Sequence, residues 1–541
     1  MRRREFLKLG GAVLAGGAIA GCSDQSKAAS PSRNSATTSP SSTSARTTTS
    51  SRATTTSTTV SRPSPADWTS LSKSLDGRLV LPGSSAYPTD ALSYNPVFDG
   101  AHPQAIAYVG SPSDVAKAIS FGRDHGVRLS IRSGGHCYGG WSTGNGLVID
   151  VSKLSAVSVN GEQVTAGSGT RLVDLYAACA PHAIAVPGGS CPSVGLAGLT
   201  MGGGLGVIDR KFGLTCDNLQ SADVVLASGE LVTCDASSHS DLFWALRGGG
   251  GGNFGAVTGF RFLAHAIGEL AIFTLVWPWS SAAQVAAAWQ EWAPHAPDEL
   301  WSNCLLIASQ NTPSGEAPAA RVTGVYVGSQ SALEAELQPF LRAVTSASPF
   351  TNFVGSAGYL DTMLIEAGCD GDSVAECHLP SQNPAGILTR GPFAAKSDIV
   401  TKALPTAGIR AMMAAVEARQ SSPVLSGGGL ALDAAGGAIN RVSPTATAFV
   451  HRDGLFTVQY SATWNEGAPA SVVAANRTWL AQAWGSMRPY VSGQAYQNYI
   501  DPALKGWANA YYGQNLARLE EVKRRYDPGD LWSFPQSLPV A

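Results

Sequence analysis

Two glycine-rich stretches of the sequence each carry one side chain that can form a covalent bond. Residues 132–136 read Arg-Ser-Gly-Gly-His, and residues 188–195 read Gly-Gly-Ser-Cys-Pro-Ser-Val-Gly. A glycine-rich turn offers bare backbone N–H groups to a phosphate or a flat ring, because no Cβ blocks the approach. We therefore expect a bound cofactor near the His136 imidazole and the Cys191 thiol.

Other roles are common for both residue types. A single His is usually a hydrogen-bonded structural residue, and a single Cys is usually a small buried hydrophobe. The sequence contains neither an H-E-x-x-H nor a C-x-x-C motif, so a metal site has little support. A third glycine run, residues 250–255, satisfies the dinucleotide pattern G-x-G-x-x-G. That pattern should follow a strand and open a helix, whereas this run follows a helix-like stretch, so we do not expect a nicotinamide-binding Rossmann domain.

The two motifs, in this order and followed by the glycine-rich residues 202–206 and 247–250, resemble the berberine-bridge-enzyme-like oxidases, a branch of the vanillyl-alcohol-oxidase flavoproteins. The resemblance implies an FAD held by two covalent bonds, one from His136 to the flavin 8α-methyl and one from Cys191 to flavin C6. It also implies that the neighbouring residues contact the cofactor: Arg132, Ser133, Gly134, Gly135, Val194, Gly195, Gly198, Gly202, Gly203, Gly206 and Asn498.

Residues 496–501 read Tyr-Gln-Asn-Tyr-Ile-Asp and resemble the Tyr-x-Asn-Tyr-x-Asp motif of the same family. The second tyrosine of that motif is the catalytic base in several members, which makes Tyr499 the first candidate. Tyr496 and Asn498 accompany it, but an extended segment would place them on the opposite face from Tyr499. Tyr138, two residues after the histidine, resembles a helper tyrosine of carbohydrate-oxidising members; simple packing on the flavin is an equally good interpretation.

The implied reaction removes the hydroxyl proton of a substrate alcohol and transfers a hydride from its carbon to flavin N5. Val194 resembles the family position that controls oxygen access, and a valine there is associated with reoxidation by O2 to give H2O2. The sequence thus predicts an FAD-dependent oxidase of a small-molecule substrate, and the resemblance favours a carbohydrate, a glycoside or another secondary-metabolite alcohol. Two alternatives stay open: a flavin dehydrogenase that passes electrons to a membrane or protein acceptor, and a non-catalytic lipid-anchored binding protein.

Short apolar runs at residues 105–109 and 127–131 are typical of strands, and Ser111 and Pro112 begin a helix between them that ends at Gly126. Residues 157–164 read as a hairpin with an Asn-Gly turn. These elements would deliver the first glycine motif from the end of a strand.

The predicted fold class is α+β. A two-part PCMH-type FAD-binding domain covers residues 66–266 and takes back residues 488–541, with a helix near 514–525. A substrate domain with an antiparallel sheet backed by helices covers residues 267–487. Within it, residues 436–442 and 448–452 resemble strands of the family's sheet, and we expect His451 and Arg452 to pack there rather than to act in catalysis.

The rest of the sequence concerns location. Residues 3–8 read as a twin-arginine export signal, and residues 19–22, Ile-Ala-Gly-Cys, resemble a lipoprotein cleavage box that would make Cys22 a membrane anchor; ordinary cleavage is the alternative. Residues 23–65 are Ser/Thr-rich and predict a disordered linker. We expect an exported, extracytoplasmic protein, in which Cys369 and Cys377, around a short acidic loop, would form a disulfide. The net charge of −2 gives no basic surface for binding nucleic acid, so we do not expect a nucleic-acid partner.

Overall fold

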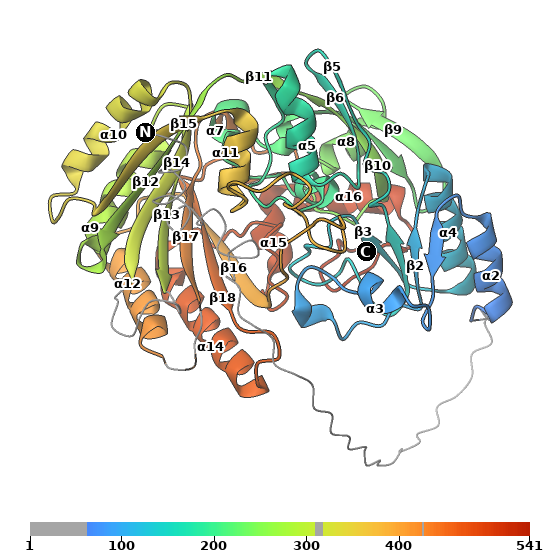
Figure 1. Cartoon of the computed structure of the whole chain (residues 1–541). Helices are drawn as coiled ribbons and strands as arrows, with labels where there is room; N and C mark the ends of the chain where they lie inside the picture. The colour runs from blue at the N-terminus through green and yellow to red at the C-terminus, as the bar shows by residue number, and fades with distance from the viewer. Residues whose placement is uncertain (1–61, 309–317, 423, 425–426, 541) are drawn as a thin grey trace.

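The structure is a computed structural model that describes residues 62–308, 318–422, 424 and 427–540 (Figure 1). The predicted export signal, Cys22 and nearly all of the predicted linker lie outside the described residues. Helix α2 (Pro65–Ser74) opens the described chain, and the Ser64 hydroxyl accepts a hydrogen bond from the Asp67 amide at its N-terminus. Folded structure therefore begins one residue before the predicted start.

The first sheet has four strands in the order β1-β2-β4-β3. Its strands are β1 (Arg78–Val80), β2 (Ala105–Tyr108), β3 (Leu129–Arg132) and β4 (Leu147–Asp150). Strand β4 runs parallel to both β2 and β3. Helix α4 (Pro112–His125) connects β2 to β3, and it ends at Gly126, whose φ of 60° is left-handed. The predicted strand–helix–strand unit is confirmed.

The second sheet has five antiparallel strands in the order β5-β6-β10-β8-β9. Its strands are β5 (Val157–Asn160), β6 (Gln163–Gly167), β8 (Leu219–Val225), β9 (Leu231–Asp235) and β10 (Ala256–Leu263). Strands β5 and β6 form the predicted hairpin. The third glycine run lies between helix α8 (Ser240–Ala245) and strand β10, so it opens no helix and is not a Rossmann turn.

A core of buried side chains joins this sheet to the helices around it. These helices are α5 (Leu172–Cys179), α6 (Leu196–Met201), α8, α15 (Trp507–Tyr512) and α16 (Leu516–Tyr526). The last two come from the end of the chain, which thus returns to the first half of the molecule, and α16 corresponds to the helix predicted near residues 514–525. A short pair of strands, β7 (Ile184–Ala185) and β11 (His265–Ala266), lies beside this unit.

The third sheet has seven antiparallel strands in the order β15-β12-β14-β13-β17-β18-β16. Its strands are β12 (Leu270–Pro278), β13 (Leu300–Ala308), β14 (Ala319–Val327), β15 (Thr351–Ala357), β16 (Phe393–Val400), β17 (Gly428–Ala434) and β18 (Phe456–Thr463). Four helices cover its outer face, on the left in Figure 1: α9 (Ala282–Trp292), α10 (Gln330–Ala343), α12 (Thr406–Gln420) and α14 (Ala470–Met487). The predicted α+β class, with an antiparallel sheet backed by helices, is confirmed.

Two predicted sheet segments are not strands. Helix α13 (Ala438–Arg441) and a loop occupy residues 436–442 and 448–452. Gly436 and Gly437 have φ values of 98° and 56°, which are not those of a strand. The remaining short helices are α3 (Tyr87–Asp90), α7 (Asp209–Phe212) and α11 (Tyr359–Glu366).

The predicted disulfide between Cys369 and Cys377 is present. It closes a short loop after α11, next to the first half of the molecule.

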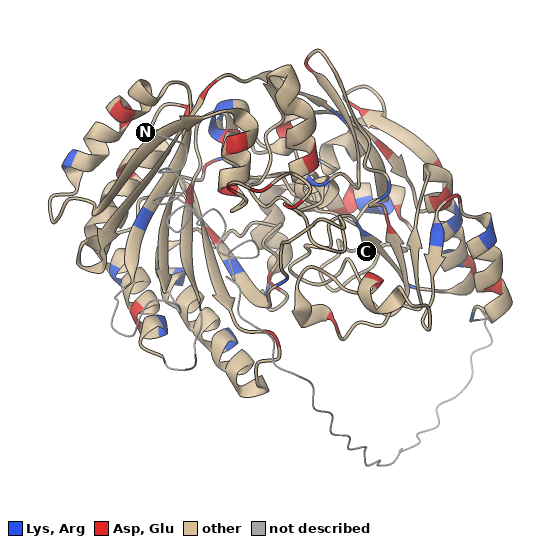
Figure 2. Cartoon of the chain, in the orientation of Figure 1, with Lys and Arg blue, Asp and Glu red and all other residues tan. Residues whose placement is uncertain are grey.

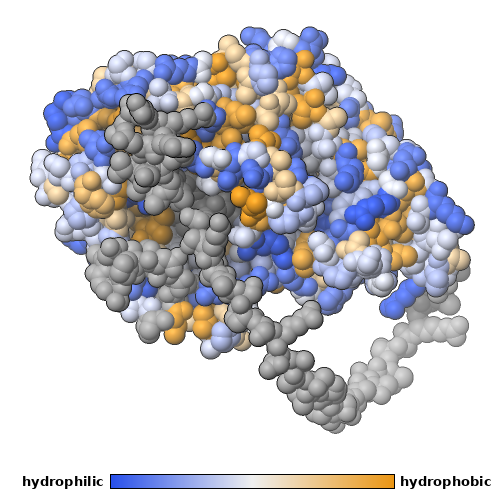
Figure 3. Space-filling model, viewed as in Figure 1, coloured by the Kyte–Doolittle hydropathy of each residue, from blue (hydrophilic) through white to orange (hydrophobic). Residues whose placement is uncertain are grey.

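Basic and acidic residues are interspersed along the ribbon (Figure 2), and hydrophilic and hydrophobic residues are mixed over the face seen in Figure 3. None of the described helices combines the length and the apolar character that crossing a membrane requires.

Candidate active site

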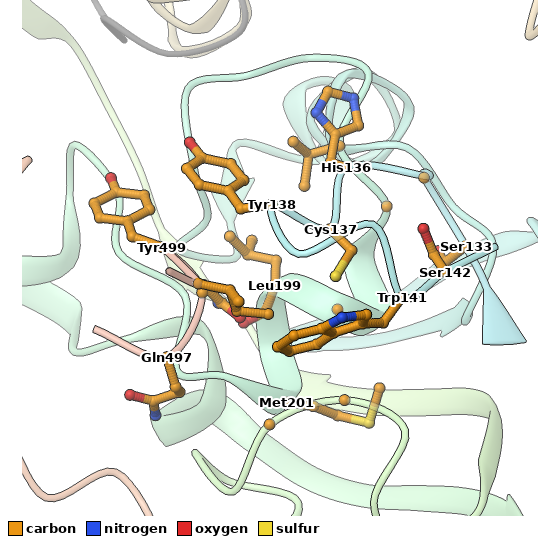
Figure 4. Close-up of a pocket in the computed structure, with 18 of the residues that line it drawn as sticks. Ser133, His136, Cys137, Tyr138, Trp141, Ser142, Leu199, Met201, Gln497 and Tyr499 are labelled. Atoms are coloured by element: carbon orange, nitrogen blue, oxygen red, sulfur yellow. The ribbon is translucent and has the colours of Figure 1, made fainter. Parts of the chain in front are cut away.

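A cavity of about 810 Å³ lies between the glycine-rich loops of the first half and the inner face of the seven-stranded sheet. It falls within the range of roughly 300–1,000 Å³ that is usual for ligand sites. Its wall includes the loop after β3, the loop before α6, the third glycine run and the C-terminal segment around Trp532. Figure 4 shows labelled side chains of the loop after β3, of α6 and of the segment with Gln497 and Tyr499 around this cavity.

The loops that carry His136 and Cys191 touch through their glycines. A Cβ on Gly134 would lie 2.2 Å from the Gly195 nitrogen, and a Cβ on Gly195 would lie 2.2 Å from both the Gly134 nitrogen and Ser133 Oγ. Only glycine permits this approach, because any other residue would push the loops apart. The two predicted linkage residues therefore share one pocket wall.

His136 is half-buried at the end of the first loop. Its ring stacks on Tyr94, with 3.8 Å between ring centroids, and its Nε2 lies 3.0 Å from Ser193 Oγ. Burial and, to a smaller extent, the positive charge of Arg171 lower the pKa of His136 to about 3. The imidazole is therefore neutral at physiological pH, and a neutral ring has the lone pair that a bond to carbon requires.

Most of the predicted cofactor-binding residues line the cavity. The members of this set are Ser133, Gly134, Gly135, His136, Cys191, Val194, Gly195, Gly198, Gly206 and Asn498. Val194 lies in the loop that leads to α6, three residues after Cys191, and its side chain is half-buried. The structure thus brings the two covalent candidates and the predicted oxygen-controlling residue to the same side of the cavity.

Arg132, Gly202 and Gly203 are not among the residues that line the cavity, and their contacts with the cofactor stay a prediction. Arg132 is buried, and its Nε donates to Asp150 Oδ2 at 2.5 Å, which ties β3 to β4. A Cβ on Gly202 would lie 1.9 Å from Asn498 Oδ1, and a Cβ on Gly203 would lie 2.7 Å from the Phe449 ring. These three residues pack behind the residues that line the cavity.

The Tyr-Gln-Asn-Tyr segment forms a turn and not an extended strand, because the Tyr499 amide donates to the Tyr496 carbonyl at 2.9 Å. The prediction that its two tyrosines lie on opposite faces is therefore wrong. Their rings meet edge to face with 4.9 Å between centroids, and Tyr496, Asn498 and Tyr499 all line the cavity. Asp501, at the end of the motif, forms a buried ion pair with Lys396 of β16, which anchors the turn to the sheet.

The two motif tyrosines differ in what holds their hydroxyl groups. The Tyr496 oxygen accepts hydrogen bonds from the Gly204 amide at 3.0 Å and from Asn498 Nδ2 at 2.9 Å. Within the described chain, no hydrogen bond is formed by the Tyr499 hydroxyl. Tyr499 is therefore the tyrosine whose hydroxyl is available to a ligand.

Tyr138 and Tyr499 lie side by side, with 5.6 Å between ring centroids and an interplanar angle of 16° (Figure 4). Gln459 Nε2 donates to the Tyr138 hydroxyl at 3.0 Å. Burial raises the pKa of both tyrosines, and the nearby Asp433 raises that of Tyr499 further. The structure thus brings the predicted base and its predicted helper together.

The inner face of the seven-stranded sheet contributes polar side chains that the sequence analysis missed. Asn303, Asp433 and Thr457 lie directly opposite one another on β13, β17 and β18, and all three line the cavity. Burial raises the pKa of Asp433 to about 7. The available signal was a single charged residue in the otherwise apolar strand β17, which has the sequence GGLALDA.

His451 and Arg452 do not line the cavity. The Arg452 guanidinium forms a buried pair with Asp217, with nitrogen–oxygen distances of 2.8 and 2.6 Å. His451 Nδ1 lies 2.7 Å from Gln494 Oε1. The expected structural role agrees with these contacts, although the two residues lie in a loop and not in the sheet.

Comparison with known proteins gives the family. Residues 103–235 match the model of an FAD binding domain, and residues 495–539 match the berberine and berberine-like model. The chain is 31% identical over 474 residues to an uncharacterized FAD-linked oxidoreductase of Bacillus subtilis, YgaK, covering 86% of this chain and 97% of the relative. This protein belongs to the berberine-bridge-enzyme-like FAD-linked oxidoreductases.

Two further relatives agree. A chitooligosaccharide oxidase of Gibberella zeae is 30% identical over 476 residues, covering 84% of this chain and 91% of the relative. The solved structure of Physcomitrella patens BBE-like 1 superposes with a TM-score of 0.79 at 29% identity, covering 88% of this chain and 99% of that one. The protein is thus an FAD-linked oxidoreductase with the fold of this family.

The cavity of this oxidoreductase fits FAD on its own evidence. Several side chains that line it have buried polar atoms without a hydrogen-bond partner in the described chain: Ser142, Thr143, Asp209, Gln497, Trp532 and Gln536. Buried polar groups are rarely left unpaired, so these atoms indicate a polar ligand. The glycines of the third run, which also line the cavity, leave its backbone open to a phosphate or ring. When bound here, FAD supplies the hydride acceptor.

Proposed function

We propose that the protein is an oxidase that takes a hydride from the hydroxyl-bearing carbon of a carbohydrate, glycoside or related alcohol and passes the electrons to O2, giving H2O2. The observation that carries this proposal is the stacked Tyr138–Tyr499 pair. It lines the same cavity as His136 and as the polar sheet residues Asn303, Asp433 and Thr457. A base, a cofactor site and hydroxyl-binding side chains meet in one cavity.

Tyr499 would take the hydroxyl proton of the substrate, because its own hydroxyl has no partner among the described residues. Its pKa is raised, so the proton can leave only when donors near the bound substrate and cofactor stabilise the phenolate. Tyr138 and Gln459 form the nearest hydrogen-bonded pair beside it. The Tyr496 hydroxyl oxygen already accepts hydrogen bonds from Gly204 and Asn498, so Tyr496 supports the turn and is not the proposed base.

The sheet side of the cavity favours a substrate with several hydroxyl groups. Asn303, Asp433, Thr457 and Gln459 offer donors and acceptors, and Trp301 adds an aromatic face. Arg128 is the basic residue among the described lining residues, and it belongs to the opposite wall, where it donates to the Ser533 carbonyl. Among the described lining residues, none would offer a phosphorylated or carboxylated substrate a positive charge near Tyr499.

FAD is proposed to be held by covalent bonds from His136 and Cys191. The shared wall and the neutral imidazole support this arrangement. The purified full chain should keep its yellow colour in the pellet after acid denaturation. The colour should survive His136→Ala or Cys191→Ala alone and be lost in the double variant; a pellet that is colourless in the wild type would refute covalent attachment.

Turnover is tested by a screen of sugars, glycosides, phenolic alcohols and alkaloids for H2O2 release. We expect sugars or glycosides to react. Turnover with an artificial dye under anaerobic conditions, but none with O2, would refute the oxidase and establish a dehydrogenase. Protein purified without flavin would instead favour a binding role.

We also propose that the chain is exported by the twin-arginine route and anchored through a lipid on Cys22. The support is the order of the Arg-Arg motif, the apolar stretch and the Ile-Ala-Gly-Cys box. The Cys22→Ser variant should leave the membrane fraction and appear in the soluble extracytoplasmic fraction. A wild-type protein that never reaches the membrane would refute the anchor.

A further inference from the structure

A segment of the substrate half reaches across to the loop that carries Ser193. We call residues 378–390, which follow the Cys369–Cys377 disulfide, the strap. Gln382 of the strap donates from Nε2 to the Ser193 carbonyl at 3.2 Å. Ser193 in turn places its Oγ 3.0 Å from His136 Nε2. One side chain of the substrate half is therefore two contacts away from the histidine.

The strap is held at both ends. At its start, His378 Nε2 lies 3.2 Å from Asp174 Oδ2 of α5. At its end, Arg390 Nε donates to the Ser93 carbonyl at 2.7 Å, and the same guanidinium forms an ion pair with Asp99. Leu379 of the strap packs in one cluster with Tyr94, the residue on which the His136 ring stacks. The strap thus supports both the plane of the imidazole and the partner of its Nε2 atom.

The contact with Ser193 engages one of the two ring nitrogens of His136. Nε2 lies 3.0 Å from the Ser193 hydroxyl, which can donate or accept a hydrogen bond. Nδ1 is then the ring nitrogen that remains to form a bond to carbon. No described residue forms a hydrogen bond with Nδ1.

We propose that Ser193 and Gln382 are positioning residues for covalent attachment of the flavin: they engage Nε2 of His136, leave Nδ1 to form the bond, and make bond formation depend on the contact between the strap and Ser193. This inference rests on the covalent FAD proposed above. Attachment replaces one C–H bond of the flavin 8α-methyl and the imidazole N–H bond with one C–N bond. The two electrons and two protons released reduce the flavin, and O2 reoxidises it with formation of H2O2.

The test follows formation of the histidine bond by itself. In a Cys191→Ala background, the purified full chain is incubated aerobically with FAD, and samples are acid-precipitated over time to separate covalent from released flavin. The variants are Ser193→Ala, Ser193→Thr and Gln382→Leu. Asn383→Leu is the matched control, because it removes a neighbouring strap amide whose oxygen accepts a hydrogen bond from the Ala385 amide, within the strap itself.

We expect Ser193→Ala and Gln382→Leu to form the bond about three- to tenfold more slowly than the parent, as for loss of one hydrogen bond. Total bound FAD should stay unchanged, and Ser193→Thr, which keeps the hydroxyl, should restore the parental rate. Equal rates in all variants would overturn the inference. A Ser193→Thr variant as slow as Ser193→Ala would also overturn it, because packing and not the hydroxyl would then matter. If the parent itself forms no acid-stable flavin, the covalent FAD fails, and this inference fails with it.

Discussion

Replacing Gly195 with alanine should force apart the two loops that hold the flavin. Gly195 has φ −81° and ψ 133°, which alanine adopts freely, so backbone strain is not expected. The new Cβ, however, would lie 2.2 Å from the Gly134 nitrogen and 2.2 Å from Ser133 Oγ. Overpacking of this kind costs about 1–3 kcal/mol, and the backbone atoms on one side cannot rotate away. We therefore expect a loss of stability in this range and a reduced covalent flavin fraction.

Gly485 offers a control. It is exposed in α14, outside the cavity, and a Cβ there would have no atom within 4 Å. Gly485→Ala should leave flavin content unchanged and stabilise the helix by up to about 1 kcal/mol.

Urea unfolding gives the free energy of unfolding of each variant, and acid precipitation gives the flavin fraction that stays with the protein. If Gly195→Ala matched Gly485→Ala in both measurements, the loops would not be in backbone contact, and the shared wall described above would be wrong.

Three further changes test other parts of the site. Tyr499→Phe should lower kcat by about 10²–10⁴-fold with covalent flavin unchanged, measured by O2 consumption with a reactive alcohol; wild-type turnover would exclude Tyr499 as the base. Burial raises the pKa of Asp433 from 3.8 to about 7, so the folded protein binds more protons than the unfolded chain in this window, and stability falls as pH rises through it. Asp433→Asn should reduce this dependence in urea unfolding between these pH values, and an unchanged slope would contradict the raised pKa. Replacing Cys369 and Cys377 by serine should cost about 2–3 kcal/mol, as expected for a short closed loop, and an unfolding midpoint equal to that of the wild type would show that the disulfide adds no stability.

The loops of the FAD site could be predicted from the sequence because each loop is one contiguous motif. Residues 132–136 must follow a strand, and residues 188–195 must precede a helix, so their glycines, His136 and Cys191 are contiguous signals. The strand–helix–strand unit and the hairpin were predictable for the same reason, since capping and turn residues act within a few positions.

The sheet side of the cavity could not be predicted in this way, because its residues are brought together by the register of paired strands. Asn303, Asp433 and Thr457 are far apart in sequence and come together only because β13, β17 and β18 pair at those positions. The sequence of one strand does not specify which strands pair with it. A shift of the strand register by one residue would turn these side chains to the other face of the sheet.

The tyrosine motif shows the same division. The sequence motif made Tyr499 the first candidate for the base. The orientation of the Tyr496 side chain depended on a turn that other parts of the chain hold in place, including Lys396 of β16. Gly202 and Gly203 also look like cofactor loops in sequence, yet Asn498 and Phe449 occupy the space beside them. The sequence by itself determined the family and the FAD cofactor and gave the candidate reactive side chains, because local motifs encode them. Only the tertiary structure decided which groups face one another, because those contacts join segments whose separation in sequence carries no information about distance.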